Sequence, residues 1–183
     1  MNCIKQLQNK LKPNQCAVIL SPYNRLYFTE FESSEGLLIA DLKNVELYVD
    51  FRYIEAAKKK LNSDILVKLK QQDNLFYIEQ FIKQNSINLL FVEGDFINAA
   101  FYAKLVNNLK DIVNIDINLD VINEFRAVKN NNQLEKIKSA QAITDRVYSQ
   151  ILNDIRIGIS ERQLKSRIIY LLYKYGADGL SFE

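Results

Sequence analysis

Residues 16–20 read CAVIL, an unbroken apolar run with turn-forming residues on both sides. A run of this length, without alternation between apolar and polar positions, is typical of a β-strand that is covered on both faces. The next segment, residues 21–24 (SPYN), is predicted to be a loop because Ser, Pro and Asn favour turns.

Further strands and helices are predicted on either side of this run. Apolar or alternating runs predict strands at residues 37–40, 46–49, 65–69, 89–92 and 112–117. Helical spacing or propensity predicts helices at residues 3–11, 51–61, 74–84 and 97–109. The turn Lys43-Asn44 joins two of the strands into a hairpin. This alternation predicts the α/β class, with a mixed sheet flanked by helices that runs to about Asn123.

The pattern changes after Arg126. A long helix is predicted from Asn131, with Asn130 as its N-cap and Gln133 completing a capping box. Its apolar stripe extends to Ile155. A second helix begins at another capping box, in which Ser160 is the cap and Gln163 reaches back.

The last eight residues, 176–183 (GADGLSFE), are interpreted as the end of that second helix followed by the start of a strand. Two helices and a strand start do not form a compact unit, because a strand needs a hydrogen-bonded neighbour. We therefore expect a piece of a longer protein, with one domain at residues 1–124 and an incomplete one at residues 125–183.

Composition excludes several kinds of function. A net charge of +2 gives no electrostatic case for nucleic-acid binding. The absence of histidine from these 183 residues excludes Ser-His, Cys-His and His-metal chemistry within them. The two cysteines, Cys3 and Cys16, do not form a zinc motif, and Cys16 is predicted to be buried. Without an apolar signal segment or membrane span, we expect a cytoplasmic protein.

Several short motifs of the chain resemble those of one known family. Residues 126–129 (RAVK), 158–161 (GISE) and 176–183 are similar to the opening of the catalytic domain of the pita-bread peptidases, the family of aminopeptidase P and prolidase. Residues 21–29 (SPYNRLYFT), 49–53 (VDFRY) and 91–95 (FVEGD) resemble segments of bacterial Xaa-Pro peptidases. The resemblance spans the whole chain in the correct order. One departure is Glu30, where the family usually has glycine, so we expect a changed turn there.

The resemblance implies a creatinase-like N-terminal domain followed by the first two helices and the strand start of a pita-bread α+β domain. In the family, two divalent metal ions, often manganese, are held by two Asp, one His and two Glu. A metal-bound hydroxide attacks the peptide bond before proline. These ligands follow the segment ending at Glu183, so no catalytic or metal-binding residue is assigned here. The chain alone is expected to be inactive, and the parent to be a homodimer acting on peptides with proline second.

The resemblance points to Arg52 and Tyr53 as substrate or interface residues, since N-terminal domains of the family help to form dimers. Arg52 suits a substrate carboxylate. The structural alternative, which we favour, is an ion pair with Asp50 or Glu55.

Asn24 and Arg25 are candidates for the rim of a site or a dimer contact. Turn chemistry, with Asn24 bonding local backbone, is the favoured alternative. Glu93 and Asp95 could suggest paired carboxylates or a metal site, but capping of the next helix explains Asp95 better.

Two other functions remain open at this point. Pita-bread relatives without metals bind proteins, so a non-catalytic binding module competes with the enzyme. Creatinase-like C–N hydrolysis has no particular support. The sequence does not separate dipeptidase from aminopeptidase activity.

Overall fold

The computed structural model describes residues 3–117 and 120–181, which fall into two compact units, Met1–Ala127 and Val128–Glu183. The boundary expected after residue 124 lies inside helix α6 (Asp120–Ala127), for which the sequence patterns had predicted no helix. Among the described residues, no helix is both long enough and apolar enough to cross a lipid bilayer.

The described part of the first unit contains a mixed sheet of six strands in the order β4-β3-β2-β1-β5-β6. The strands are β1 (Gln15–Ile19), β2 (Leu37–Asp41), β3 (Val45–Val49), β4 (Leu66–Leu69), β5 (Leu89–Val92) and β6 (Asn114–Asp116). β2 pairs antiparallel with β1 and β3, and the remaining pairs are parallel. The predicted mixed sheet and the predicted hairpin are confirmed.

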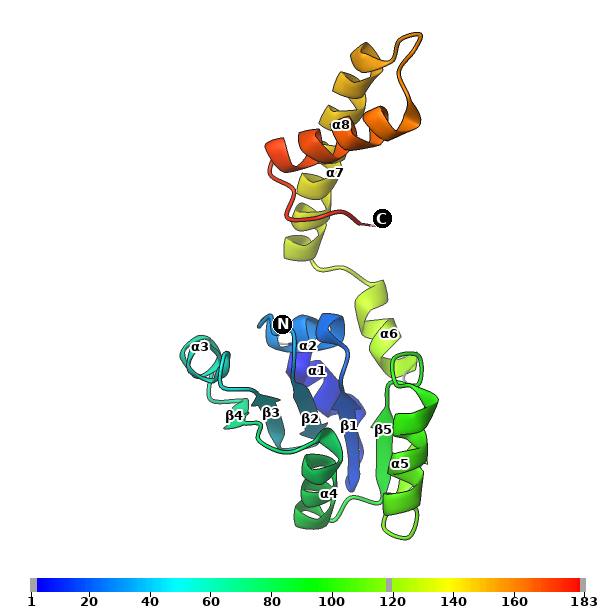
Figure 1. The fold of residues 1–183 in the computed structure, drawn as a ribbon. Coiled ribbons are helices and arrows are strands. Elements are labelled where there is room, and N and C mark those ends of the chain that lie inside the picture. The colour runs from blue at the N-terminus through cyan, green and yellow to red at the C-terminus, as the bar shows by residue number, and fades with distance from the viewer. Residues whose placement is uncertain (1–2, 118–119, 182–183) are drawn as a thin grey trace. The chain divides into compact units, whose positions relative to one another are not determined.

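Helices cover both faces of the sheet, as Figure 1 shows. Alternate residues of β1 belong to two separate cores. Ala17 and Ile19 pack with residues of α1 (Cys3–Lys10), α2 (Pro22–Thr29), α3 (Ile54–Lys60) and α6. Cys16 and Val18 pack with α4 (Asn74–Asn85) and α5 (Ala99–Leu109). The strand is therefore buried on both faces, and the prediction for residues 16–20 is confirmed for β1.

Helix α2 corrects one expectation and shows the conformation of the turn at Glu30. The predicted loop at residues 21–24 is wrong, because Ser21 caps α2 and Pro22 begins it. Proline is suited to the first helical position, where its missing N–H has no intrahelical partner. At the other end, Glu30 adopts the left-handed conformation, with φ 55° and ψ 18°. This is the backbone region that favours glycine, so Glu30 occupies a conformation that is uncommon for a residue with a side chain.

The second unit contains α7 (Asn131–Ile151), the short 3-10 helix η1 (Leu152–Asp154) and α8 (Glu161–Lys174). Both predicted capping boxes, at Asn130 and at Ser160, are present. Val147, Ile151 and Leu171 form the buried core of this unit.

Two details of the second unit differ from expectation. The apolar stripe of α7 stops before Ile155, which is 54% exposed because the helix ends at Ile151. Gly176 ends the turn after α8 with φ 92°, but Gly179–Ser181 do not form a strand. A single extended segment has no ladder to join within the described residues. The rest of the predicted strand start, residues 182–183, lies outside them.

Candidate functional site

The turn between β3 and α3 holds the two principal site candidates. Arg52 forms an ion pair with Asp50, in which its Nε lies 3.1 Å and its Nη2 lies 2.6 Å from Asp50 Oδ2. The Arg52 backbone N–H also donates to Asp50 Oδ1 at 2.9 Å. The hydrogen bond from Arg52 lowers the pKa of Asp50 below its usual value, and the same bond raises the pKa of Arg52. The favoured structural pairing therefore exists, and its partner is Asp50.

Tyr53 connects this turn to the segment between α2 and β2. Its hydroxyl pairs with Ser34 Oγ at 3.0 Å, and its ring meets Phe31 edge to face at 6.4 Å between centroids. The hydrogen bond with Ser34 lowers the pKa of Tyr53. Arg52 lies over the same ring, 5.3 Å from its centroid. We call Asp50, Arg52 and Tyr53 the Arg52 corner.

Arg25 lies in the interior, so its expected place in a rim loop is wrong. Its side chain comes from α2, and the residue is only 2% exposed. Its guanidinium donates to the carbonyl oxygens of Leu20 and Ser33, the latter at 2.9 Å. A Cβ on Gly36 would lie 3.1 Å from Arg25 Nε, so glycine makes room for the guanidinium. Burial lowers the pKa of Arg25, and the nearby Glu35 and Glu93 oppose that shift.

Glu93 is a buried carboxylate that accepts hydrogen bonds from the main chain just after β1. It is 4% exposed and follows β5 directly. Its Oε2 accepts the backbone N–H groups of Leu20 at 2.5 Å and Ser21 at 2.7 Å. Its Oε1 accepts Nδ2 of Asn24 at 2.6 Å. Because β1 and β5 are parallel neighbours, their carboxyl ends meet at this carboxylate.

Asn24 is part of the same cluster and does not simply bond its own turn. Its Oδ1 accepts Nη1 of Arg126, at 2.9 Å, from the last turn of α6. We call Asn24, Glu93 and Arg126 the Glu93 cluster. Sequence reasoning weighed Glu93 as one of two paired carboxylates or as a metal ligand, and not as an acceptor for main-chain N–H groups. The signal that could have found its role is a glutamate immediately after a buried strand that parallels β1.

The second acid of this segment, Asp95, does not cap the following helix. Asn98 is the N-cap of α5, and its Oδ1 accepts the N–H of Phe101 at 2.8 Å. The preference of Asn for N-caps explains the choice. Within residues 3–117 and 120–181, no three His, Cys, Asp or Glu side chains are grouped so that they could hold a metal ion.

The segment between α2 and β2, residues 31–36, links the candidate residues. Arg25 binds the carbonyl of Ser33, and Tyr53 binds the side chain of Ser34. The charge of Glu35 acts on both arginines: it opposes the burial that lowers the pKa of Arg25, and it adds to the hydrogen bond with Asp50 that raises the pKa of Arg52. The structure thus brings three of the four candidates to one segment, while Asn24 belongs to the Glu93 cluster.

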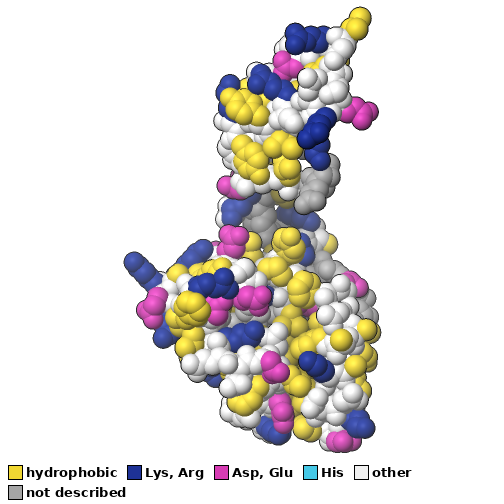
Figure 2. Space-filling model, in the orientation of Figure 1, with side chains coloured by type: hydrophobic (Ala, Val, Ile, Leu, Met, Phe, Trp, Pro, Cys, Tyr) yellow, Lys and Arg dark blue, Asp and Glu magenta, His cyan; other side chains and the backbone are white. Residues whose placement is uncertain are grey.

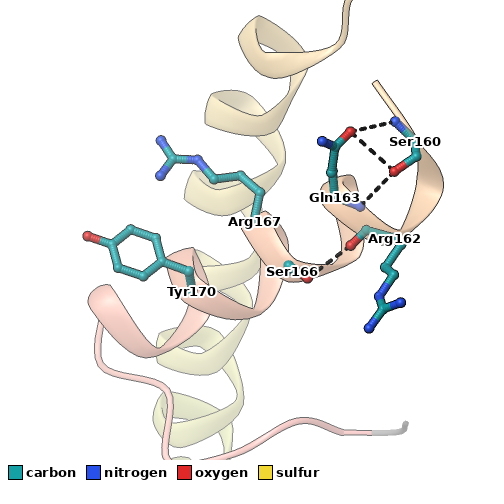
Figure 3. A pocket seen from close by; sticks show the side chains of 6 residues that line it. All are labelled: Ser160, Arg162, Gln163, Ser166, Arg167 and Tyr170. Atoms are coloured by element: carbon teal, nitrogen blue, oxygen red, sulfur yellow. Dashed lines mark hydrogen bonds between the residues drawn. The ribbon is translucent and has the colours of Figure 1, made fainter. Parts of the chain in front are cut away.

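A depression in the second unit lies at the start of α8 (Figure 3). The side chains of Ser160 and Gln163 at its wall are engaged in the capping box. Figure 3 shows Arg162 and Arg167 pointing in different directions, and Arg167 Nε donates to Asp154 at 2.8 Å. These side chains therefore serve the local fold and do not converge on one point.

The family model for the creatinase/prolidase N-terminal domain matches residues 4–128. The chain belongs to this family. The resemblance found in the sequence is thereby confirmed. The creatinase/prolidase N-terminal domain corresponds to the described α/β fold, with its mixed sheet flanked by helices.

Curated relatives extend beyond this domain. The chain is 32% identical to the "putative Xaa-Pro aminopeptidase" of Mycoplasma genitalium, with 98% of this chain and 49% of the relative covered. It is 28% identical to the Xaa-Pro dipeptidase of Pyrococcus furiosus, covering 90% of this chain and 45% of that protein. The chain spans about half the length of the curated relatives it matches.

Solved structures share the fold. The Xaa-Pro dipeptidase from Bacillus anthracis matches with a TM-score of 0.84 at 20% identity, over 96% of this chain and 49% of that one. Prolidase from Pyrococcus furiosus matches with a TM-score of 0.74 at 23% identity, over 96% and 49%. In both cases, the creatinase/prolidase N-terminal domain and the segment after it together match about half of the solved chain.

Proposed function

We propose that the chain is the N-terminal part of a metallopeptidase that cleaves Xaa-Pro bonds at the N-termini of peptides. The observation that carries this proposal is the match of nearly the whole chain to half of the Mycoplasma genitalium relative. That match extends past the family domain, which ends at residue 128, into the second unit. Shared ancestry over both units supports a shared parent architecture.

In this proposal, the second unit is the beginning of a pita-bread domain. Its helices leave large apolar side chains in solvent, as Figure 2 shows for one face. Ile137 is 50%, Tyr148 65% and Tyr170 55% exposed. An isolated helical pair that exposes this much apolar surface is typical of a unit that packs against further structure.

The described residues do not fit the two divalent metal ions, often manganese, of the family's catalytic centre. Histidine is absent from the sequence, and the part of the chain at residues 3–117 and 120–181 groups no three acidic, Cys or His side chains for a metal. The chemistry would therefore belong to the remainder of the parent. We expect the 183-residue chain alone, supplied with manganese, not to hydrolyse peptides with proline at the second position.

The role proposed for the first unit is to form the homodimer and to shape the substrate site. Its candidate contact is the Arg52 corner, because the Arg52 side chain is 51% exposed despite its pairing with Asp50. A guanidinium held by one carboxylate keeps a defined orientation, so it can receive a peptide carboxylate from its open side.

The test uses the full-length parent with Arg52→Ala and Asp50→Asn as a matched pair. Both variants break the ion pair, but only Arg52→Ala removes the cation. If Arg52 contacts substrate, Arg52→Ala raises KM about tenfold with kcat retained, because a hydrogen bond to a charged group is lost, while Asp50→Asn has a smaller effect.

If the two variants have the same KM as each other and lose the same thermal stability, Arg52 has a structural role only. A folded parent that binds no manganese and leaves the peptide intact would instead favour the non-catalytic binding module.

A further inference from the structure

Three side chains from distant parts of the first unit form a continuous hydrogen-bonded line. Glu93 follows β5, Asn24 lies in the first turn of α2, and Arg126 lies in the last turn of α6. The Asn24 amide bridges its neighbours, with Nδ2 2.6 Å from Glu93 Oε1 and Oδ1 2.9 Å from Arg126 Nη1.

The chemistry of the two ends explains why the middle residue is an asparagine. An ionised carboxylate only accepts hydrogen bonds, and a guanidinium only donates them. The side chain between them must therefore donate on one side and accept on the other. A primary amide does both with fixed geometry, and the two neighbours fix which way it points. Aspartate would match Arg126 but would place a second carboxylate against Glu93.

The inner end of the line is firmly held. Glu93 is 4% exposed, and its second oxygen accepts the main-chain N–H groups of Leu20 and Ser21. Asn24 is thus tied to the edge where β1 and β5 end. The outer end is Arg126, one residue before the first unit finishes at Ala127.

Helix α6 makes other contacts with α2. The Tyr27 hydroxyl donates to the carbonyl oxygen of Phe125 at 2.8 Å, and Phe28 meets the Phe125 ring edge to face at 6.0 Å. Ile122 is buried in the core that α2 shares. The end of α6 is therefore attached to α2 by apolar contacts and by the polar line.

We propose that Asn24 is a latch that locks the last turn of α6 onto α2, and so fixes the point at which the chain leaves the first unit. Through Glu93, Asn24 and Arg126, the end of α6 is held at a defined position relative to the carboxyl ends of β1 and β5. The latch is a property of this chain and does not depend on the reaction of the parent.

The experiment is amide hydrogen exchange of the 183-residue chain, read at the amides of α6 and, as an internal reference, at those of β5. Local opening sets the exchange rate of each segment. Asn24→Ala is expected to speed exchange in α6 about tenfold or more, while β5 stays as protected as in the unchanged chain. Lys83→Ala, which removes an exposed pair on α4, is the control and should leave α6 unchanged.

Three comparisons separate a latch from simple packing. Asn24→Leu, which is similar in size but can neither donate nor accept a hydrogen bond, should open α6 as much as Asn24→Ala. Arg126→Ala should accelerate exchange in α6 at least as much as Asn24→Ala, and adding Asn24→Ala to it should change the rate little further. Arg126→Lys, which retains a donor, should partly restore protection.

Unchanged α6 exchange in Asn24→Ala, or normal protection in Asn24→Leu, would overturn the proposal. If Asn24→Ala loses protection throughout the sheet, Arg126→Ala decides, because it leaves the Asn24–Glu93 bond in place. Normal α6 exchange in that variant would also overturn the latch.

Discussion

Removal of the Glu93 carboxylate should be among the most damaging single changes in the first unit. In Glu93→Ala, the main-chain N–H groups of Leu20 and Ser21 lose their acceptor, and Asn24 loses one as well. Leu20 is 8% and Ser21 6% exposed, so water does not readily replace the carboxylate. The site is one where buried donors would be left unpaired.

The magnitude follows from those donors. Each buried, unsatisfied main-chain donor costs about 1–3 kcal/mol, so two donors predict a loss of about 2–6 kcal/mol. That is comparable with the whole stability of a small domain, about 5–15 kcal/mol. Glu93→Gln keeps one oxygen for the backbone N–H groups and should cost only about 1–2 kcal/mol. The reasoning therefore predicts the loss of unfolding free energy in each variant, and also that Glu93→Ala loses more than Glu93→Gln.

The assay is urea unfolding of the 183-residue chain, followed by circular dichroism and by tyrosine fluorescence. Glu79→Gln is the matched control, because Glu79 forms an exposed i,i+4 pair with Lys83, and its loss should change the unfolding free energy by less than about 0.5 kcal/mol. If Glu93→Ala unfolds within about 0.5 kcal/mol of the unchanged chain, the carboxylate does not hold the β1–α2 turn. If Glu93→Ala does not fold, the free energy of unfolding of Glu93→Gln must still be lower than that of the Glu79→Gln control.

Three further outcomes are expected. A Cβ on Gly94 would lie 2.5 Å from the carbonyl oxygen of Ile117, so Gly94→Ala should cost about 1–3 kcal/mol; an unchanged melting temperature would refute the close approach. Burial raises the pKa of Cys16, so native Cys16 should not react with a disulfide reagent at pH 8, and rapid reaction would contradict its burial. Its contribution to stability is full below about pH 8.5 and falls as pH rises, because only the unfolded thiol ionises. The hydrogen bond from Arg52 holds the pKa of Asp50 below 3.8, so the stabilisation is present above that pH and lost as pH falls through the folded value. Arg52→Ala should raise this pKa in an NMR titration of the carboxyl, and an unchanged value would exclude the pairing in solution.

The sheet could be predicted because its strands carry their own signals. The run at residues 16–20 and the hairpin through Lys43-Asn44 need only local pattern and turn chemistry. The capping boxes at Asn130 and Ser160 are equally local, since cap and partner are three residues apart. Helix α2 was missed because the Ser-Pro pair favours a turn and also starts a helix, and only tertiary packing decides between them.

The Glu93 cluster could not be predicted from local pattern, because its bonds join residues 69 and 102 positions apart. Arg25 was misplaced for a similar reason. An arginine is usually exposed, and it is buried here only because the fold brings the carbonyls of Leu20 and Ser33 to its guanidinium. The ion pair of Asp50 and Arg52 spans two residues and was accessible to sequence reasoning.

The proposal that this chain is the front part of a proline-specific metallopeptidase is tested most directly on the product of its complete reading frame. The gene is read past the codon for Glu183, the whole product is expressed, and hydrolysis of a peptide with proline at the second position is measured with manganese. The same peptide with alanine at that position is the control. We predict cleavage of the proline peptide alone. A folded product that leaves it intact would contradict the account.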